Sequence, residues 1–134
     1  TVADADDSPK GVRVLVIDDS KTIRRSAETL LAREGYDVIT AVDGFDALAK
    51  IADSRPEIIF VDVMMPRLDG YQTCALIKKN TKFQRTPVIM LSSKDGLFDR
   101  ARGRMVGSDQ YLTKPFTKES LLKTVAAHVN KAAA

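Results

Sequence analysis

The sequence predicts an α/β domain, a doubly wound parallel sheet of (βα)5 pattern with helices on both faces. Five short runs rich in β-branched residues alternate with segments whose apolar residues recur at helical spacing. The first, third and fourth runs are nearly all apolar, as expected of strands that helices cover on both sides. Because crossovers between parallel strands are right-handed, the helices are divided between the two faces of the sheet.

The strands are predicted from these runs in chain order. They are Val12–Ile17, Tyr36–Ala41, Ile58–Val61, Val88–Leu91 and Gln110–Thr113.

The helices are predicted from apolar spacing and from their start and stop signals. The first has apolar residues at i, i+4, i+7 and i+8, from Ile23 to Leu31, and Gly35 ends it. Asp43, with Asp46 three residues later, indicates the start of the second. The third and fourth are expected at about 70–80 and 95–106. The fifth begins after Thr117 as N-cap and carries an apolar face from Leu121 to Val129.

Length and composition limit the kind of protein. The 134 residues suit one domain, and 44% hydrophobic and 29% charged residues are ordinary values for a globular protein. We expect a disordered tail at 1–10, the domain at 11–130 and a frayed C-terminus at 131–134. The single cysteine, Cys74, excludes an internal disulfide. No apolar run reaches the roughly 18 residues of a membrane span, and no signal peptide is evident, so we expect a cytoplasmic protein without membrane insertion.

The net charge of +3 is mildly basic. It falls short of the dense basic stripe that binding to nucleic-acid backbones requires, so we expect no nucleic-acid partner.

Polar residues follow four of the five predicted strands. Asp18 and Asp19 end the first, Asp62 the third, Ser92 the fourth and Lys114 the fifth. In such a fold a site lies outside the carboxyl ends of the strands, so these groups converge at one edge. Clustered carboxylates repel each other, and a hard divalent cation is the expected compensation. Carboxylates, a carbonyl and waters suit Mg²⁺.

This set of groups predicts chemistry on phosphorus. The Asp62 carboxylate is placed as a nucleophile that forms an acyl phosphate beside Mg²⁺. Lys114 would pair with phosphoryl oxygens, and the Ser92 hydroxyl would donate a hydrogen bond to another.

Two other kinds of phosphate chemistry fit less well. A phosphatase of the haloacid dehalogenase type needs Asp-x-Asp at the nucleophile, whereas Met64 stands at the second position. Nucleotide binding has neither GxxxxGK[ST] nor a GxGxxG after a strand.

Four motifs resemble the receiver domain of two-component response regulators: VLVIDDS (14–20), VDVMMPRLDG (61–70), PVIMLSS (87–93) and YLTKPF (111–116). The intervals agree with that family: 43 residues from Asp19 to Asp62, 30 to Ser92 and 22 to Lys114. The resemblance covers about residues 11–130. It implies a flavodoxin-like sheet with strand order 2-1-3-4-5.

The resemblance also implies roles for the acidic residues. Asp62 would be the phosphoacceptor and a Mg²⁺ ligand, Asp19 would bind Mg²⁺ directly, and Asp18 would act mainly through water. The main-chain carbonyl of Met64 would be a further ligand. Its side chain, like that of Lys94, would influence the lifetime of the phosphoryl group.

Three more residues acquire roles from the resemblance. Lys114 would hold the phosphoryl group, Ser92 would move towards it, and Tyr111 would follow Ser92 inward as the aromatic switch residue. The Lys114–Pro115 bond is expected to be cis. A half-buried strand aromatic without a switching role is the alternative for Tyr111.

Two longer segments, 28–78 and 86–116, are similar to stand-alone receivers of the chemotaxis-like pathway that controls type IV pili and twitching motility. The resemblance then implies a CheA-like histidine kinase as phosphodonor, a pilus-associated or other effector protein downstream, and a monomer. It implies a switch that phosphorylates itself from a donor and is not a turnover enzyme. A receiver fragment of a larger regulator and a binding module independent of phosphorylation are the alternatives.

Overall fold

The computed structural model describes residues 11–93 and 97–133, without the side chains of 97–99 and 130–133. The expected tail at 1–10 and Lys94 lie outside these residues. The described strands are β2 (Arg13–Ile17), β3 (Asp37–Ala41), β4 (Ile58–Asp62), β5 (Val88–Ser92) and β6 (Gln110–Thr113). The described helices are α1 (Lys21–Arg33), α2 (Gly44–Ser54), α3 (Gly70–Lys79), α4 (Leu97–Met105) and α5 (Lys118–Ala133).

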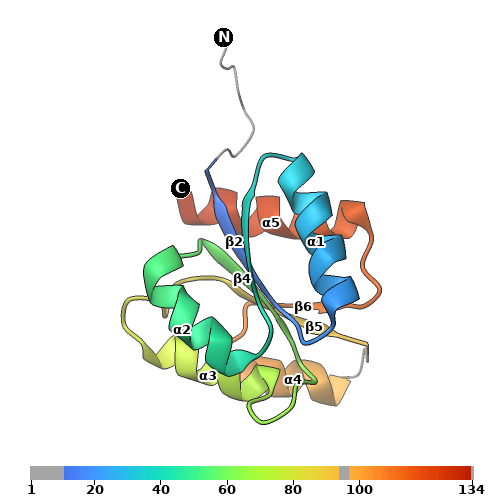
Figure 1. The fold of residues 1–134 in the computed structure, drawn as a ribbon. Helices are drawn as coiled ribbons and strands as arrows, with labels where there is room; N and C mark the ends of the chain where they lie inside the picture. Colours follow the sequence, from blue (N-terminus) through green and yellow to red (C-terminus); the bar gives the residue numbers. More distant parts are fainter. Residues whose placement is uncertain (1–10, 94–96, 134) are drawn as a thin grey trace.

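The strands form one parallel sheet in the order β3-β2-β4-β5-β6, which is 2-1-3-4-5 in chain order (Figure 1). This confirms the predicted fold. The inner strands β4 and β5 are buried throughout, whereas the edge strand β6 is only half-buried. The register sets Ile17 beside Val61 and Asp62 beside Leu91, so the ends of β2, β4 and β5 adjoin.

Each face of the sheet has its own apolar core. Alternate residues of β2 show the division, since Leu15 belongs to one core and Val16 to the other. Helices α2 and α3 cover the first face with residues such as Ile51 and Ile77. Helices α1 and α5 cover the second, where Leu31 packs in the same core as α5 residues. The sheet is therefore a rigid support for the groups at its edge.

Side chains at the starts of α2 and α5 accept hydrogen bonds from the first free amides of these helices. The Asp43 carboxylate accepts a hydrogen bond from the Asp46 amide at 2.7 Å, and Thr117 Oγ1 accepts one from the Ser120 amide at 3.0 Å. Both predicted start signals are thereby confirmed. The described part of α4 falls within the expected 95–106, and α5 continues to Ala133. No helix among the described residues is both long enough and apolar enough to span a membrane.

Candidate functional site

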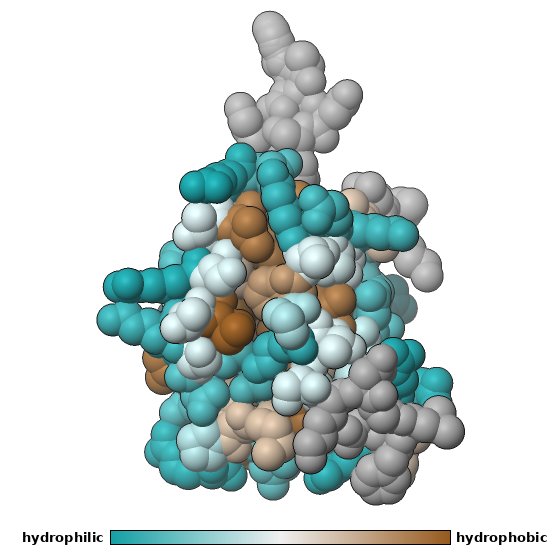
Figure 2. Space-filling view, turned by 90° about the vertical axis from the view of Figure 1, so that its right-hand side faces the viewer, coloured by the Kyte–Doolittle hydropathy of each residue, from teal (hydrophilic) through white to brown (hydrophobic). Residues whose placement is uncertain are grey.

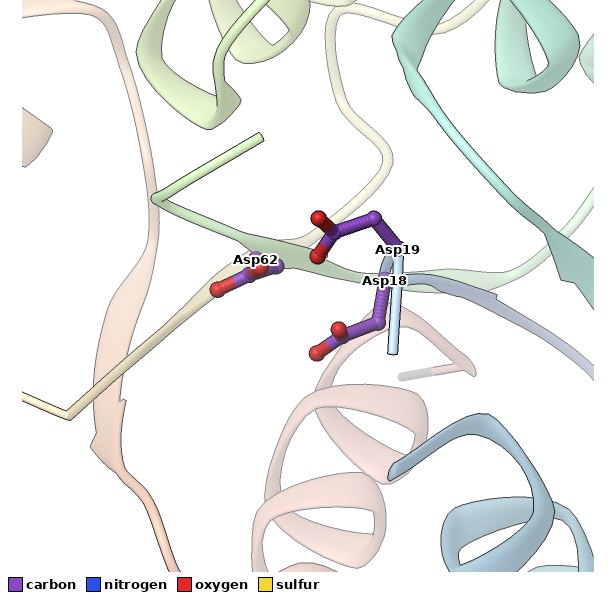
Figure 3. A group of neighbouring side chains, drawn as sticks. All are labelled: Asp18, Asp19 and Asp62. Carbon is purple, nitrogen blue, oxygen red and sulfur yellow. The ribbon is translucent and has the colours of Figure 1, made fainter. Parts of the chain in front are cut away.

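Three carboxylates converge where β2 and β4 end. Asp18 and Asp19 follow β2, and Asp62 is the last residue of β4, the strand beside it. One oxygen of each carboxylate lies within 4.8 Å of the others, and the side chains point into a common space (Figure 3). Asp18 and Asp62 are buried, whereas Asp19 is exposed. The predicted acidic cluster is therefore present and opens to solvent on the Asp19 side.

The backbone around Asp18 explains why its side chain turns inward. Its amide continues the β2 ladder by donating to the Ala41 carbonyl at 3.2 Å. Its carboxylate accepts a hydrogen bond from the Ser20 amide at 2.9 Å, just before α1 begins. Arg24 of α1 donates to the Asp18 carbonyl at 2.6 Å. The start of α1 thus holds Asp18 in place, and Asp19 remains exposed to solvent at the rim of the acidic group.

Lys114 joins the two buried carboxylates. Its Nζ lies 3.0 Å from an Asp62 oxygen and 3.2 Å from an Asp18 oxygen. The Lys114 amide donates to the Ser92 carbonyl at 2.7 Å, which ties the chain after β6 to the end of β5. The Lys114–Pro115 bond is cis, as expected. Among the described residues, Lys114 supplies the ammonium that contacts this group of three carboxylates, so negative charge is in excess within the group.

This arrangement changes the acidity of both partners. Burial raises the pKa of Asp62 to about 6; Lys114 opposes the rise and the neighbouring charge of Asp18 adds to it. Burial alone would lower the pKa of Lys114, but its contacts with Asp62 and Asp18 outweigh this and raise its pKa. Lys114 is therefore a firmly held cation, and Asp62 is a carboxylate with few compensating charges.

The other predicted site residues lie around this centre. Ser92 is buried at the end of β5, next to β4. Tyr111 is half-buried in β6, beside Met90, and the Arg100 guanidinium lies 5.7 Å from its ring centroid. The Met64 amide lies 3.4 Å from an Asp62 oxygen, at the long limit of a hydrogen bond, and the Met64 side chain is 68% exposed. Tyr111 is one strand further from Asp62 than Ser92 is.

The donor set suits a hard divalent cation. Three carboxylates can offer oxygen ligands from one side, with solvent reaching them past Asp19, and no thiolate or imidazole takes part in this group. Oxygen ligands with retained waters are what Mg²⁺ prefers. The excess negative charge and the raised pKa of Asp62 give the cation a favourable electrostatic position. The acidic group is therefore consistent with a Mg²⁺ site.

The surface on the side of the molecule where these strands end is mixed in character. Figure 2, seen from the side of Figure 1 where β2, β4 and β5 end, shows hydrophilic and hydrophobic residues side by side. Met64 and Phe45 are among the exposed hydrophobic residues of the described chain. The site is thus an acidic centre on a surface that can also contact apolar groups.

Sequence reasoning assigned no role to some residues that shape this site. A Cβ on Gly70 would lie 2.3 Å from the Asp62 carbonyl oxygen, so only glycine allows α3 to begin this close to the end of β4. The position of Gly70 at the end of the LDG motif was a sequence signal for this close approach. Arg24 and Arg67 also contact segments that support the site: Arg24 donates to the Asp18 carbonyl, and Arg67 forms an ion pair with Asp43. No local sequence pattern indicates these partners.

Comparisons with known proteins agree with this geometry. The family model described as response regulator receiver domain matches residues 14–126. Protein PilG of Pseudomonas aeruginosa is 77% identical over 119 residues, which are 89% of this chain and 88% of that protein. The probable transcriptional regulator ycf27 of Porphyridium aerugineum is 41% identical, and there the match spans 90% of this chain but 50% of the relative.

A solved structure extends the agreement to three dimensions. The chemotaxis protein CheY4 of Vibrio cholerae is similar with a TM-score of 0.85 and 36% identity, covering 87% of this chain and 98% of that one. The sheet order, the acidic cluster and the residues that match the family model all support the same family assignment. The chain belongs to the response regulator receiver domain family, whose members are signalling domains and not turnover enzymes.

Proposed function

We propose that this protein is a phosphorylation switch in which Asp62 accepts a phosphoryl group from the phosphohistidine of a histidine kinase, with Mg²⁺ bound beside it. Membership of the receiver family implies a histidine kinase as donor. The observation that carries the proposal is the placement of the Asp62 carboxylate within 4.8 Å of the Asp18 and Asp19 oxygens and 3.0 Å from Lys114 Nζ.

The transfer needs no base, because the Asp62 carboxylate is ionised above its pKa of about 6. One carboxylate oxygen attacks phosphorus, and the new O–P bond forms as the P–N bond to the donor imidazole breaks. The electron pair of the P–N bond remains on the imidazole nitrogen. Mg²⁺, held by Asp18, Asp19, Asp62 and the Met64 carbonyl, would neutralise charge on the transferred group.

The residues at the neighbouring strand ends then respond to the new charge. A phosphoryl group adds about −1.5 to −2 at pH 7 and three acceptor oxygens. Lys114 already lies against Asp62 and exchanges a carboxylate oxygen for a phosphoryl oxygen. Ser92, buried at the end of β5, donates its hydroxyl, and Tyr111 follows it inward. This changes the surface formed by α4 and β6, which meets the downstream protein.

The biological setting is part of the proposal. The 77% identity with PilG supports a role in the chemotaxis-like pathway that controls type IV pili and twitching motility, in the cytoplasm, with a CheA-like kinase and a pilus-associated effector. We propose a monomer without nucleic-acid contact.

Intact mass spectrometry after incubation with acetyl phosphate tests this function. We expect one phosphoryl adduct that requires Mg²⁺, is absent in Asp62→Asn and persists in Asp53→Asn, a control at an exposed aspartate of α2. Because some receivers accept only from a kinase, the protein is also titrated with beryllium fluoride and Mg²⁺. Failure of both the adduct and the beryllofluoride complex would favour a binding module independent of phosphorylation.

A further inference from the structure

The loop between β4 and α3 contains a strained residue. Arg67 has a φ of +68°, and the Leu68 amide donates to the Pro66 carbonyl at 2.8 Å across it. This is a γ-turn of the rare hand, a conformation that glycine adopts with less strain than arginine. The strain of an arginine at this position has to be offset by the contacts of its side chain.

Those contacts all reach the start of α2. The Arg67 guanidinium forms an ion pair with the Asp43 carboxylate and lies 5.5 Å from the ring centroid of Phe45. Leu68 packs against the backbone between them, since a Cβ on Gly44 would lie 2.8 Å from Leu68 Cδ2. Three contacts thus hold the tip of the β4–α3 loop against residues 43–45.

The surface that receives the loop is itself fixed. The Asp43 side chain is 15% exposed, and its other oxygen accepts the Asp46 amide at 2.7 Å. Two residues earlier, the Ala41 carbonyl accepts the Asp18 amide at 3.2 Å. The same short segment therefore touches both the loop after Asp62 and the backbone of Asp18.

The base of the loop lies at the acidic site. Gly70 donates to the Val63 carbonyl at 3.0 Å, and the Met64 amide lies 3.4 Å from the Asp62 carboxylate. Val63 and Met65 are anchored by burial, whereas Met64 between them is exposed. The Met64 carbonyl thus lies in the stretch of loop between the acidic site and the tip that Arg67 holds.

We propose that Arg67 is a positioning residue: by tying the β4–α3 loop to Asp43 and Phe45, it orients the Met64 carbonyl for the metal site and so sets the Mg²⁺ affinity. This rests on the proposed function, which needs that site. Arg67 would act through the loop and touch neither the metal nor the phosphoryl group.

The test is a Mg²⁺ titration of the amide NMR spectrum for wild type, Arg67→Gly and Arg67→Lys. Arg55→Gly is the matched control: Arg55 is exposed, has a φ of +47° and lies at the opposite end of α2, as its C-cap. In both glycine variants the relief of backbone strain offsets the greater freedom of the unfolded chain and, at position 67, the lost ion pair, so both are expected to keep a thermal stability near that of wild type. A fall in affinity therefore cannot be attributed to poorer folding.

We expect Arg67→Gly to weaken Mg²⁺ binding by about threefold to tenfold, at or below the low end of the range for residues that orient metal ligands. Arg67→Lys keeps the charge that pairs with Asp43 and should recover part of the affinity. In metal-free protein, the Leu68 and Gly70 amides should exchange faster in Arg67→Gly only.

Unchanged Mg²⁺ affinity in Arg67→Gly, or an equal loss in Arg55→Gly, would overturn the positioning role. Absence of Mg²⁺ binding in the wild type would instead refute the proposed function. In that case amide exchange still decides whether Arg67 holds the loop, and unchanged exchange at Leu68 and Gly70 would overturn that as well.

Discussion

The buried Asp62 carboxylate allows a direct test of the site's electrostatics, because its charge opposes folding when no metal is bound. Asp62 is 3% exposed and lies close to Asp18 and Asp19, with Lys114 as its cationic contact. The variant Asp62→Asn keeps the shape of the side chain and removes the charge. We expect this variant to be more stable than the wild type in metal-free buffer at pH 8.

The magnitude follows from the change in pKa. The Asp62 pKa rises from 3.8 to about 6, and each pKa unit corresponds to about 1.4 kcal/mol. The ionised group therefore lowers the free energy of unfolding by at most about 3 kcal/mol. This value is already net of the 3.0 Å contact with Lys114, which opposes the pKa rise, so we expect a stabilisation of about 1–3 kcal/mol, the upper limit being the full cost of ionisation.

The pH dependence has a definite sign. Because the folded-state pKa lies above the unfolded value, the folded protein holds a proton that the unfolded chain has lost between about pH 4 and pH 6. The contribution of Asp62 to stability is thus favourable at low pH and is lost as pH rises through about 6. The advantage of Asp62→Asn should be about a third of its full value at pH 4.5 and complete at pH 8.

Urea unfolding followed by circular dichroism, in EDTA at both pH values, measures this difference. Mg²⁺ should narrow the difference at pH 8, since at ten times its dissociation constant it stabilises the wild type by about 1.4 kcal/mol and the variant less. A variant less stable than the wild type in EDTA at pH 8, or a difference independent of pH, would refute the reasoning.

Three further predictions concern neighbours of Asp62. Lys114→Met leaves buried carboxylates uncompensated and should lower the free energy of unfolding by about 3 kcal/mol at pH 8 and by less at pH 5, where Asp62 is protonated, as urea titrations would measure. Gly70→Ala places a Cβ 2.3 Å from the Asp62 carbonyl oxygen, so about 2 kcal/mol of stability and most Mg²⁺ binding should be lost. Calorimetry would record the loss of stability and the loss of Mg²⁺ binding. Gly103→Ala is the control: a Cβ on Gly103 would lie 3.0 Å from the Ser108 hydroxyl, so stability and Mg²⁺ binding should both change little. Met64→Ala removes an exposed apolar cover beside Asp62 and should speed loss of the phosphoryl group, followed by the decay of the intact-mass adduct; an unchanged decay rate would exclude this shielding.

The convergence of the acids was predictable, because parallel strands bring their carboxyl ends to one edge whatever the loops do, and the strand order followed from the resemblance to the receiver family. Which of the two adjacent aspartates, Asp18 or Asp19, is buried could not be predicted from the sequence. Asp18 turns inward because its amide extends the β2 ladder and its carboxylate accepts the Ser20 amide. Those partners depend on how α1 leaves the strand, and a sequence pattern does not specify that.

Contacts between loops could not be predicted from the sequence either. Arg67 and Asp43 are 24 residues apart, in loops that no periodic pattern connects. The left-handed conformation of Arg67 could not be expected either, because such positions usually carry glycine. The helix start at Asp43 was predicted correctly, but the ion pair of Asp43 with Arg67 arises from tertiary packing.

The most direct test of the central claim is to locate the phosphoryl group itself. Protein incubated with acetyl phosphate and Mg²⁺ is treated with borohydride, which reduces an acyl phosphate on aspartate to homoserine, and the peptides are then mapped by mass spectrometry. The proposed switch predicts homoserine at position 62 and unmodified Asp18 and Asp19. Homoserine at either of those residues, with position 62 unchanged, would contradict it.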